Sequence, residues 1–228
     1  MDGMYIAVFI NYVRYVHNWL LDCIAPPLCA YCTQLLAKRS VLCDCCKSQV
    51  VPLVSVSLFI NASYTMSVMC IGEYKDPLKK LILAKGHADY IASHELGQLL
   101  YDMTTIKDMQ FDFIVPVPLH WSRSLYRGYN QAHEMAIVLS ERLQIPCVPL
   151  LKRTRATAFQ SSVVHTERKH NVKHAFAFTT TDIQQYTNKR ILIVDDLMTT
   201  GSTLKSIAHC LIGFNPMSLH AIVVSRVK

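Results

Sequence analysis

The feature that most constrains the fold is an alternation of short apolar segments with amphipathic segments across residues 111–228. The predicted strands are FDFIVPVP at 111–118, IPCVPLL at 145–151, ILIVDD at 191–196 and SLHAIVVSRV at 218–227. The predicted helices are NQAHEMAIVLSERL at 130–143 and TLKSIAHCLIGF at 203–214. Such alternation is typical of a parallel sheet with crossover helices. ILIVDD is apolar enough to be buried on both faces, as parallel strands are. The sequence therefore predicts an α/β fold.

In the first half of the chain, the sequence predicts a small accessory region followed by the first part of the α/β domain. A strand is expected in SYTMSVMCIGEY at 63–74, and helices at 76–85 and 88–103. We divide the chain into residues 1–53, with a leading helix and a cysteine cluster, and residues 54–228, the α/β domain. Polar residues interrupt the apolar N-terminus, which we interpret as an amphipathic or partly buried helix rather than a transmembrane segment. Attachment to a membrane surface is the alternative.

Composition restricts the partners and the compartment. The 228 residues are 51% hydrophobic and 17% charged, which argues against extensive disorder. The formal net charge of +7 favours anionic partners such as nucleotides, phosphorylated sugars or nucleic acid. Nine cysteines, an odd number, without a recognisable export signal fit a reducing compartment better than a disulfide scaffold.

Two carboxylates and a run of hydroxyls follow the apolar strand at 191–194. Asp195 and Asp196 lie where ligands bind in parallel sheets, at the carboxyl ends of the strands. The residues that lead into the next helix are Thr199, Thr200, Gly201, Ser202 and Thr203. A helix N-terminus with free N–H groups attracts phosphate, and the carboxylates would accept hydrogen bonds from sugar hydroxyls. The pattern therefore predicts a site for ribose 5-phosphate.

Two other classes of protein also place carboxylates after an apolar strand. A response-regulator receiver needs several further strand–helix units downstream, whereas 32 residues follow Asp196. A Walker B strand needs a GxxxxGK[ST] partner, which the sequence lacks. A capped turn without a ligand is the remaining alternative. The coincidence of acids, glycine and hydroxyls favours the sugar phosphate.

Two CxxC pairs lie close together near the N-terminus. Cys29, Cys32, Cys43 and Cys46 have the spacing of a structural Zn²⁺ site, in which four thiolates close the coordination sphere and leave no open position for catalysis. Cys45 is an alternative ligand to one of its neighbours. Metal binding would contribute directly to the folding of so small a region.

These motifs together resemble a known family. ILIVDDLMTTGSTL is similar to the phosphoribosyl pyrophosphate (PRPP) motif of type I phosphoribosyltransferases. VPVPLHWSRSLYRGYNQA, LLKRTRATAFQSSVVHTERKHNVKHAF, the final VVSR and the cysteine pairs resemble the ComF/GntX branch. The resemblance implies the type I phosphoribosyltransferase fold, PRPP bound with Mg²⁺, structural Zn²⁺, and a role in DNA uptake during natural transformation. It also implies a cytoplasmic location, with membrane association through uptake partners such as a DNA helicase. Tyr129 and the pair Leu197-Met198 depart from the family pattern.

Basic residues supply candidates for two further roles. By resemblance, the loop after residue 118 holds pyrophosphate, and the candidates are Arg123, Arg127, Gly128 and Lys85. Residues 151–178 carry six Lys or Arg against one acid, a net +5. From this segment the candidates for binding single-stranded DNA are Lys152, Arg153, Arg155, Arg168 and Lys169. A substrate-covering loop and a solvated charged face are the alternatives.

The functional prediction has two forms. In the first, the protein is a ComF-like component of DNA uptake that binds PRPP and single-stranded DNA. In the second, it is an active phosphoribosyltransferase of nucleotide metabolism, in which the acid pair holds the ribose while pyrophosphate leaves. No residue identifies an acceptor base.

Overall fold

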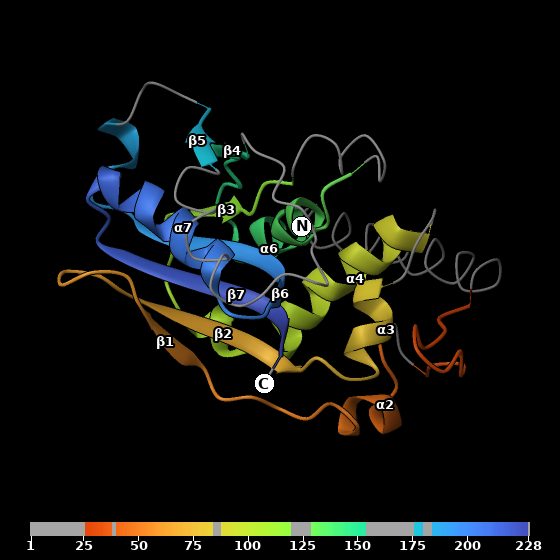
Figure 1. The fold of residues 1–228 in the computed structure, drawn as a ribbon. Helices are drawn as coiled ribbons and strands as arrows, with labels where there is room; N and C mark the ends of the chain where they lie inside the picture. Colours follow the sequence, from red (N-terminus) through yellow and green to blue (C-terminus); the bar gives the residue numbers. More distant parts are fainter. Residues whose placement is uncertain are drawn as a thin grey trace, which may run out of the picture. The chain divides into compact units, whose positions relative to one another are not determined.

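The computed structural model describes residues 26–37, 40–83, 88–119, 129–153, 176–179 and 184–227 (Figure 1). The chain divides into two compact units, Met1–Ser48 and Gln49–Lys228. The predicted domain boundary between residues 53 and 54 stays a prediction. Within the described residues, no helix has the length and apolar character that crossing a membrane requires.

The second unit is built on a five-stranded sheet with the order β1-β2-β7-β6-β3. Its strands are β1 Val56–Phe59, β2 Thr65–Glu73, β3 Phe113–Pro116, β6 Arg190–Met198 and β7 Ser218–Arg226. β2, β7, β6 and β3 are parallel, and β1 pairs antiparallel with β2 at one edge. The apolar run 191–194 of β6 is buried, as its composition predicts. The predicted α/β class, with a largely parallel sheet, is confirmed.

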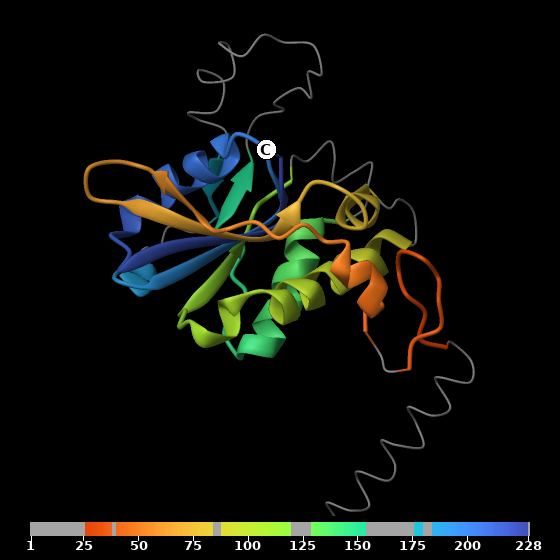
Figure 2. The same ribbon diagram turned by 90° about the horizontal axis from the view of Figure 1, so that it is seen from below.

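Helices cover both faces of this sheet. α4 (Ala88–Met103) and α6 (Gln131–Leu143) pack together on one face, while α7 (Ser202–Leu211) lies on the other (Figure 2). The Asn130 side chain caps α6 by accepting a hydrogen bond from Ala132 N–H at 3.1 Å. The short helix α3 (Leu78–Leu83) precedes α4, and 3-10 turns occupy Thr105–Asp108, Gln184–Tyr186 and Ile212–Phe214.

The segment predicted as a strand at 145–151 forms a different structure. Only an isolated parallel bridge joins Cys147 to Ile114 of β3, because Pro146 and Pro149 have no N–H to extend a ladder. The chain then forms β4 (Leu151–Arg153), which pairs antiparallel with β5 (Phe176–Phe178). This two-stranded ribbon, β4 and β5, lies on the same side of the sheet as α7 (Figure 2).

The first unit is small and consists mainly of turns. An antiparallel bridge between Leu28 and Leu35 closes the loop that carries the first cysteine pair. The second pair lies at the start of α2 (Asp44–Ser48). Cys29 and Cys46 are buried, together with Val41 and Leu42, whereas Cys32 is exposed and Cys43 is partly exposed.

Candidate functional site

The acid pair lies near the carboxyl end of β6. The strand continues to Met198, so Asp195 and Asp196 precede its end by a few residues instead of terminating it. Both side chains are half-buried, and Asp196 N–H donates a hydrogen bond to Asp195 Oδ1 at 3.0 Å. The neighbours of Asp195 in the sheet carry no charge, because it pairs with Val223 of β7 and Val117 lies on the β3 side.

Burial and nearby charges act on the Asp195 carboxyl group. Burial raises the pKa of Asp195 well above its ordinary value, and the negative charge of Asp196 raises it further. The positive charge of Arg153 acts in the opposite direction and lowers this pKa. The pair therefore gains from donors or cations that approach it, which is the property expected of a site for a polyhydroxylated, anionic ligand bound with a cation.

The hydroxyl-rich turn begins α7 as predicted. Gly201 has φ +73° and is the N-cap of the helix, so the chain here adopts the left-handed conformation that glycine tolerates best. Thr200 Oγ1 donates to Ser202 Oγ at 3.1 Å and accepts from Ser202 N–H at 3.4 Å. Thr199 and Thr200 are exposed, whereas Gly201 is buried against Leu58 of β1. The hydroxyls therefore face outward at a helix N-terminus a few residues from the acid pair.

Tyr74 is a residue of this edge that the sequence did not indicate. It follows β2, and its N–H donates to Arg226 O at the end of β7, at 3.0 Å. Burial raises the pKa of the Tyr74 phenol, and the negative charge of Asp196 raises it further, so the ring lies within electrostatic reach of the acid pair. Lys79 Nζ lies 6.0 Å from the centre of the ring. The signal available in the sequence was a tyrosine placed directly after a parallel strand.

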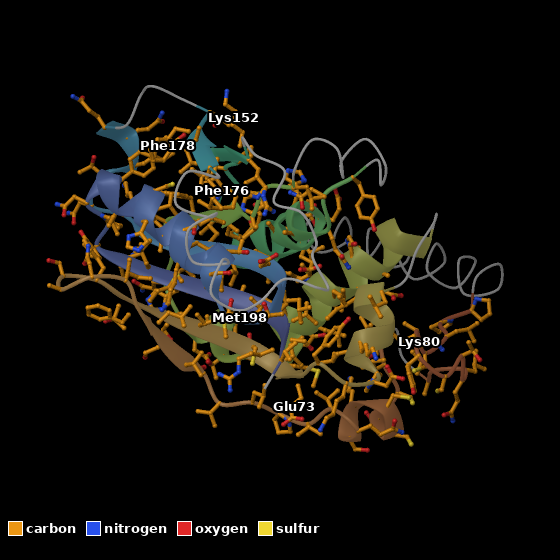
Figure 3. The ribbon with its side chains drawn as sticks, in the orientation of Figure 1. Glu73, Lys80, Lys152, Phe176, Phe178 and Met198 are labelled. Atoms are coloured by element: carbon orange, nitrogen blue, oxygen red, sulfur yellow. The ribbon has the colours of Figure 1, made fainter. Side chains whose placement is uncertain are left out.

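The other predicted binding residues are distributed unevenly. The pyrophosphate candidates Arg123, Arg127, Gly128 and Lys85 lie outside the described residues, as do the DNA candidates Arg155, Arg168 and Lys169. Lys152 of β4 is exposed and points away from the sheet (Figure 3). Arg153 is half-buried, with its guanidinium 5.6 Å from the ring centre of Phe176. Met198 is buried, so it offers no stacking surface for an acceptor.

The four predicted cysteines form one cluster in the first unit. The Sγ atoms of Cys29, Cys32, Cys43 and Cys46 all lie within 4.8 Å of one another, and those of Cys32 and Cys43 are 3.7 Å apart. Tetrahedral zinc with Zn–S bonds of about 2.3 Å places its sulfurs about 3.8 Å apart. Cys45 is exposed and is not part of the cluster. Four thiols at this separation fit a tetrahedral metal ion.

The cysteines of the cluster differ in how easily they ionise. The backbone N–H of Cys43 donates to Cys29 Sγ and that of Cys46 donates to Cys43 Sγ, both at 3.4 Å. Burial opposes ionisation of Cys29, but bonds from the backbone of Cys32, Cys43 and Tyr31 lower its pKa to about 6. Burial and the neighbouring thiols raise the pKa of Cys46. The four groups therefore cannot all ionise easily without a cation among them.

Comparison with known proteins agrees with this geometry. Residues 125–227 match the phosphoribosyl transferase domain family. The chain is 31% identical over 192 residues to competence protein F of Haemophilus influenzae, covering 81% of this chain and 78% of that protein. This chain belongs to the ComF family of phosphoribosyltransferase-like proteins.

Other relatives support membership of the ComF family. The DNA utilization protein YhgH of Escherichia coli K12 is 34% identical, covering 64% of this chain and 65% of its own. Competence protein ComFC of Bacillus subtilis is 30% identical, with coverage of 43% and 38%.

Solved structures that are similar to this ComF-family chain include two enzymes. Glutamine PRPP amidotransferase from B. subtilis, complexed with ADP and GMP, has a TM-score of 0.44 at 17% identity, covering 72% of this chain and 34% of its own. Purine phosphoribosyltransferase from Pyrococcus horikoshii Ot3 has a TM-score of 0.35 at 16% identity, covering 64% of this chain and 87% of its own.

Proposed function

We propose that this protein acts in DNA uptake during natural transformation and binds PRPP at the acid pair and the hydroxyl-rich turn. One observation supports the ligand assignment. The acid pair near the end of β6 is followed by a turn capped by Gly201 and then by the N-terminus of α7. The N–H groups and hydroxyls of residues 199–203 would hold the 5-phosphate, while Asp195 and Asp196 would accept the ribose hydroxyls. Mg²⁺ bound together with PRPP would neutralise part of the ligand's charge.

The role in DNA uptake is supported by the names of the relatives, which are competence and DNA utilization proteins. The chain's net charge of +7 and the exposed position of Lys152 are compatible with binding single-stranded DNA. A DNA helicase of the uptake machinery is the protein partner that this proposal implies. The cysteine cluster would hold structural Zn²⁺, with all four positions filled by thiolate.

Calorimetric titration with PRPP and Mg²⁺ tests the ligand assignment directly. The wild-type protein should bind, and Asp195→Asn should weaken the affinity by about 10- to 100-fold, since it removes a charged hydrogen-bond acceptor. Asp108→Asn is the matched control, because Asp108 is an exposed acid in the Thr105–Asp108 turn and should leave the affinity unchanged. Absence of binding by the wild type at millimolar PRPP would refute the assignment.

Salt dependence tests the nucleic-acid part of the proposal. The affinity for a single-stranded oligonucleotide should fall as ionic strength rises, because phosphate contacts release counterions. Lys152→Gln should reduce both the affinity and the salt slope. An affinity that does not respond to ionic strength, or an absence of binding at low salt, would refute the proposed contacts between basic side chains and the DNA phosphates.

Phosphoribosyl transfer is the second candidate function. It is favoured by Tyr74, an aromatic ring near Asp196 that could lie against a planar acceptor. In this reaction a bond forms between the acceptor nitrogen and C1, the C1–O bond to pyrophosphate breaks, and the acceptor proton passes to solvent. Pyrophosphate release from PRPP should then depend on one base within a panel. Release that no base stimulates would favour the binding protein over the enzyme.

A further inference from the structure

One continuous segment, residues 50–59, lies along the outer edge of β2, and we call it the arm. Its second half is β1, in which Val56 pairs with Val68. An antiparallel bridge also joins Pro52 to Gly72. This bridge continues the register of β1, because four residues back along the arm correspond to four residues forward along β2. The arm therefore follows β2 in a single register as far as the end of that strand (Figure 1).

Close backbone contacts at Gly72 hold the start of the arm. Glu73 N–H donates a hydrogen bond to Val51 O at 2.9 Å, and the Val50 side chain is buried. A Cβ placed on Gly72 would lie 2.6 Å from Val51 O and 2.8 Å from Val50 Cγ1, distances at which real Cβ contacts are essentially absent. Glycine is therefore required at position 72 because the arm lies directly on the backbone of β2.

The end of β2 is held from its other side by β7. The buried Ser225 donates its hydroxyl to Glu73 O at 3.2 Å, and Tyr74 N–H donates to Arg226 O at 3.0 Å. Two successive N–H groups thus point in opposite directions, that of Glu73 to the arm and that of Tyr74 to β7. A change confined to the arm should affect the first N–H group and spare the second.

The arm begins directly after the first unit. α2, which carries Cys46, ends at Ser48, and only Gln49 separates it from Val50. While the first unit is folded, the arm has ordered chain on both sides. Without metal, a unit as small as this should lose its fold, because a metal site of four thiolates contributes directly to folding. Val50 would then be the first ordered residue of the domain, and chain ends fray most readily.

The far end of the arm contacts the hydroxyl-rich turn. Leu58 pairs with Met66, which is buried, and its Cδ1 lies 3.0 Å from the position of a Cβ on Gly201. The arm therefore contacts the end of β2 through its first residues and the turn through Leu58.

We propose that the arm makes the ligand site sensitive to metal: an ion held by the four cysteines keeps the arm docked on β2, and the docked arm keeps Leu58 against the turn. The ion would be one that prefers thiolates, such as Zn²⁺. The effect on the ligand rests on the proposed function, whereas the docking of the arm does not. A metal-free chain should therefore have a loosened arm and a weaker affinity for its sugar phosphate.

Deuterium exchange of single amides, followed by NMR without any ligand, tests the docking of the arm. Glu73 N–H should exchange about tenfold faster in Cys46→Ser than in the zinc-loaded wild type, which corresponds to freeing roughly one residue of backbone. Tyr74 N–H should change much less. Cys45→Ser leaves the four-cysteine cluster intact and should behave like the wild type. Unchanged exchange at Glu73, or equal acceleration at Glu73 and Tyr74, would overturn the proposal.

Removal of zinc from the wild type with a chelator, followed by its return, gives the same comparison without a variant. Exchange at Glu73 should accelerate and then recover. Exchange that does not respond to either step would contradict the proposed coupling.

Gly72→Ala tests whether the arm is the route of the effect. This variant should retain zinc, while Glu73 N–H exchanges as fast as in Cys46→Ser. Removing zinc from Gly72→Ala should then have no further effect on this amide, as a double-mutant cycle requires when both changes act through one contact. If Gly72→Ala does not fold, Val50→Ala gives the same comparison by removing only a buried side chain. A zinc effect of equal size in both backgrounds would show that the arm is not the route.

Titration with ribose 5-phosphate, without Mg²⁺, tests the other end of the arm. The zinc-free wild type should bind about fivefold more weakly than the zinc-loaded protein, at the lower end of typical couplings between sites. If exchange at Glu73 responds to zinc but the zinc-loaded protein does not bind the sugar phosphate, the proposed ligand is wrong and the coupling of the arm to the metal stands. Equal affinity with and without zinc would refute the link to the turn.

Discussion

Replacing Gly201 by alanine should strain the hydroxyl-rich turn at the start of α7. Gly201 has φ +73°, and the left-handed region costs a residue with a Cβ about 1 to 2 kcal/mol. The new Cβ would lie 3.0 Å from Leu58 Cδ1 and 3.5 Å from Met198 Sδ. The Leu58 contact involves the end of a flexible side chain, so a shift of a few tenths of an ångström relieves it and the backbone term dominates.

Urea unfolding and thermal melting measure this cost. A loss of about 1 to 2 kcal/mol should lower the melting temperature by about 2 to 8 °C in a domain of this size. The affinity for PRPP should fall as well, because residues 202 and 203 offer their N–H groups only if the turn keeps its shape.

Gly213→Ala is the matched control for this experiment. A Cβ at Gly213 would meet nothing within 4 Å, and the residue is exposed. The control should therefore unfold like the wild type or be stabilised by up to about 1 kcal/mol. If Gly201→Ala unfolds at the wild-type urea concentration, or if both variants lose equal stability, the argument from backbone strain at the turn is wrong.

Three further predictions concern the metal, the ligand and pH. Cys46→Ser should abolish the retention of one zinc ion per chain, measured by elemental analysis after dialysis, whereas Cys45→Ser should retain it; equal zinc in both would exclude the four-cysteine site. Tyr74→Phe should leave the urea midpoint unchanged but weaken PRPP binding about fivefold, or ~1 kcal/mol, by removing the hydroxyl near Asp196; unchanged calorimetric affinity would place the phenol outside the site. Burial lowers the pKa of His220 below its ordinary value of 6.5. Its contribution to stability is therefore complete above pH 6.5 and is lost as the pH falls from 6.5 to the lower pKa of the folded state, because the unfolded chain takes up the proton first. His220→Gln should therefore show a smaller loss of stability between pH 8 and pH 5 than the wild type, and an equal loss would point to other groups.

The parts of the fold that were predictable are those with strong local patterns. The core of β6 and the helices α6 and α7 appear where apolar periodicity places them, and the cysteine cluster follows from two short CxxC spacings. The turn at Gly201 was also predictable, because glycine, hydroxyls and a preceding apolar strand are neighbours in the sequence. Local chemistry fixes each of these features.

Features that depend on long-range pairing were not predictable. The ribbon joins residues 151–153 to 176–178, and neither segment carries the alternation that would indicate a strand. Pro146 and Pro149 limit the expected strand at 145–151 to one bridge with β3. Tyr74 lies within electrostatic range of Asp196 only because β2 lies next to β7 and β7 next to β6, an order that no local pattern specifies. The different environments of Lys152 and Arg153 likewise appear only once β4 has formed.

The contact between Leu58 and Gly201 joins the edge of the sheet to the turn that would receive the ligand. An edge strand such as β1 normally frays first, since only one side of it is hydrogen-bonded. Here Leu58 of β1 packs against Gly201 in the turn. A ligand that makes the turn more rigid should therefore also slow the opening of β1. Amide hydrogen exchange in a strand that contributes no ligand-binding group would then report whether the site is filled.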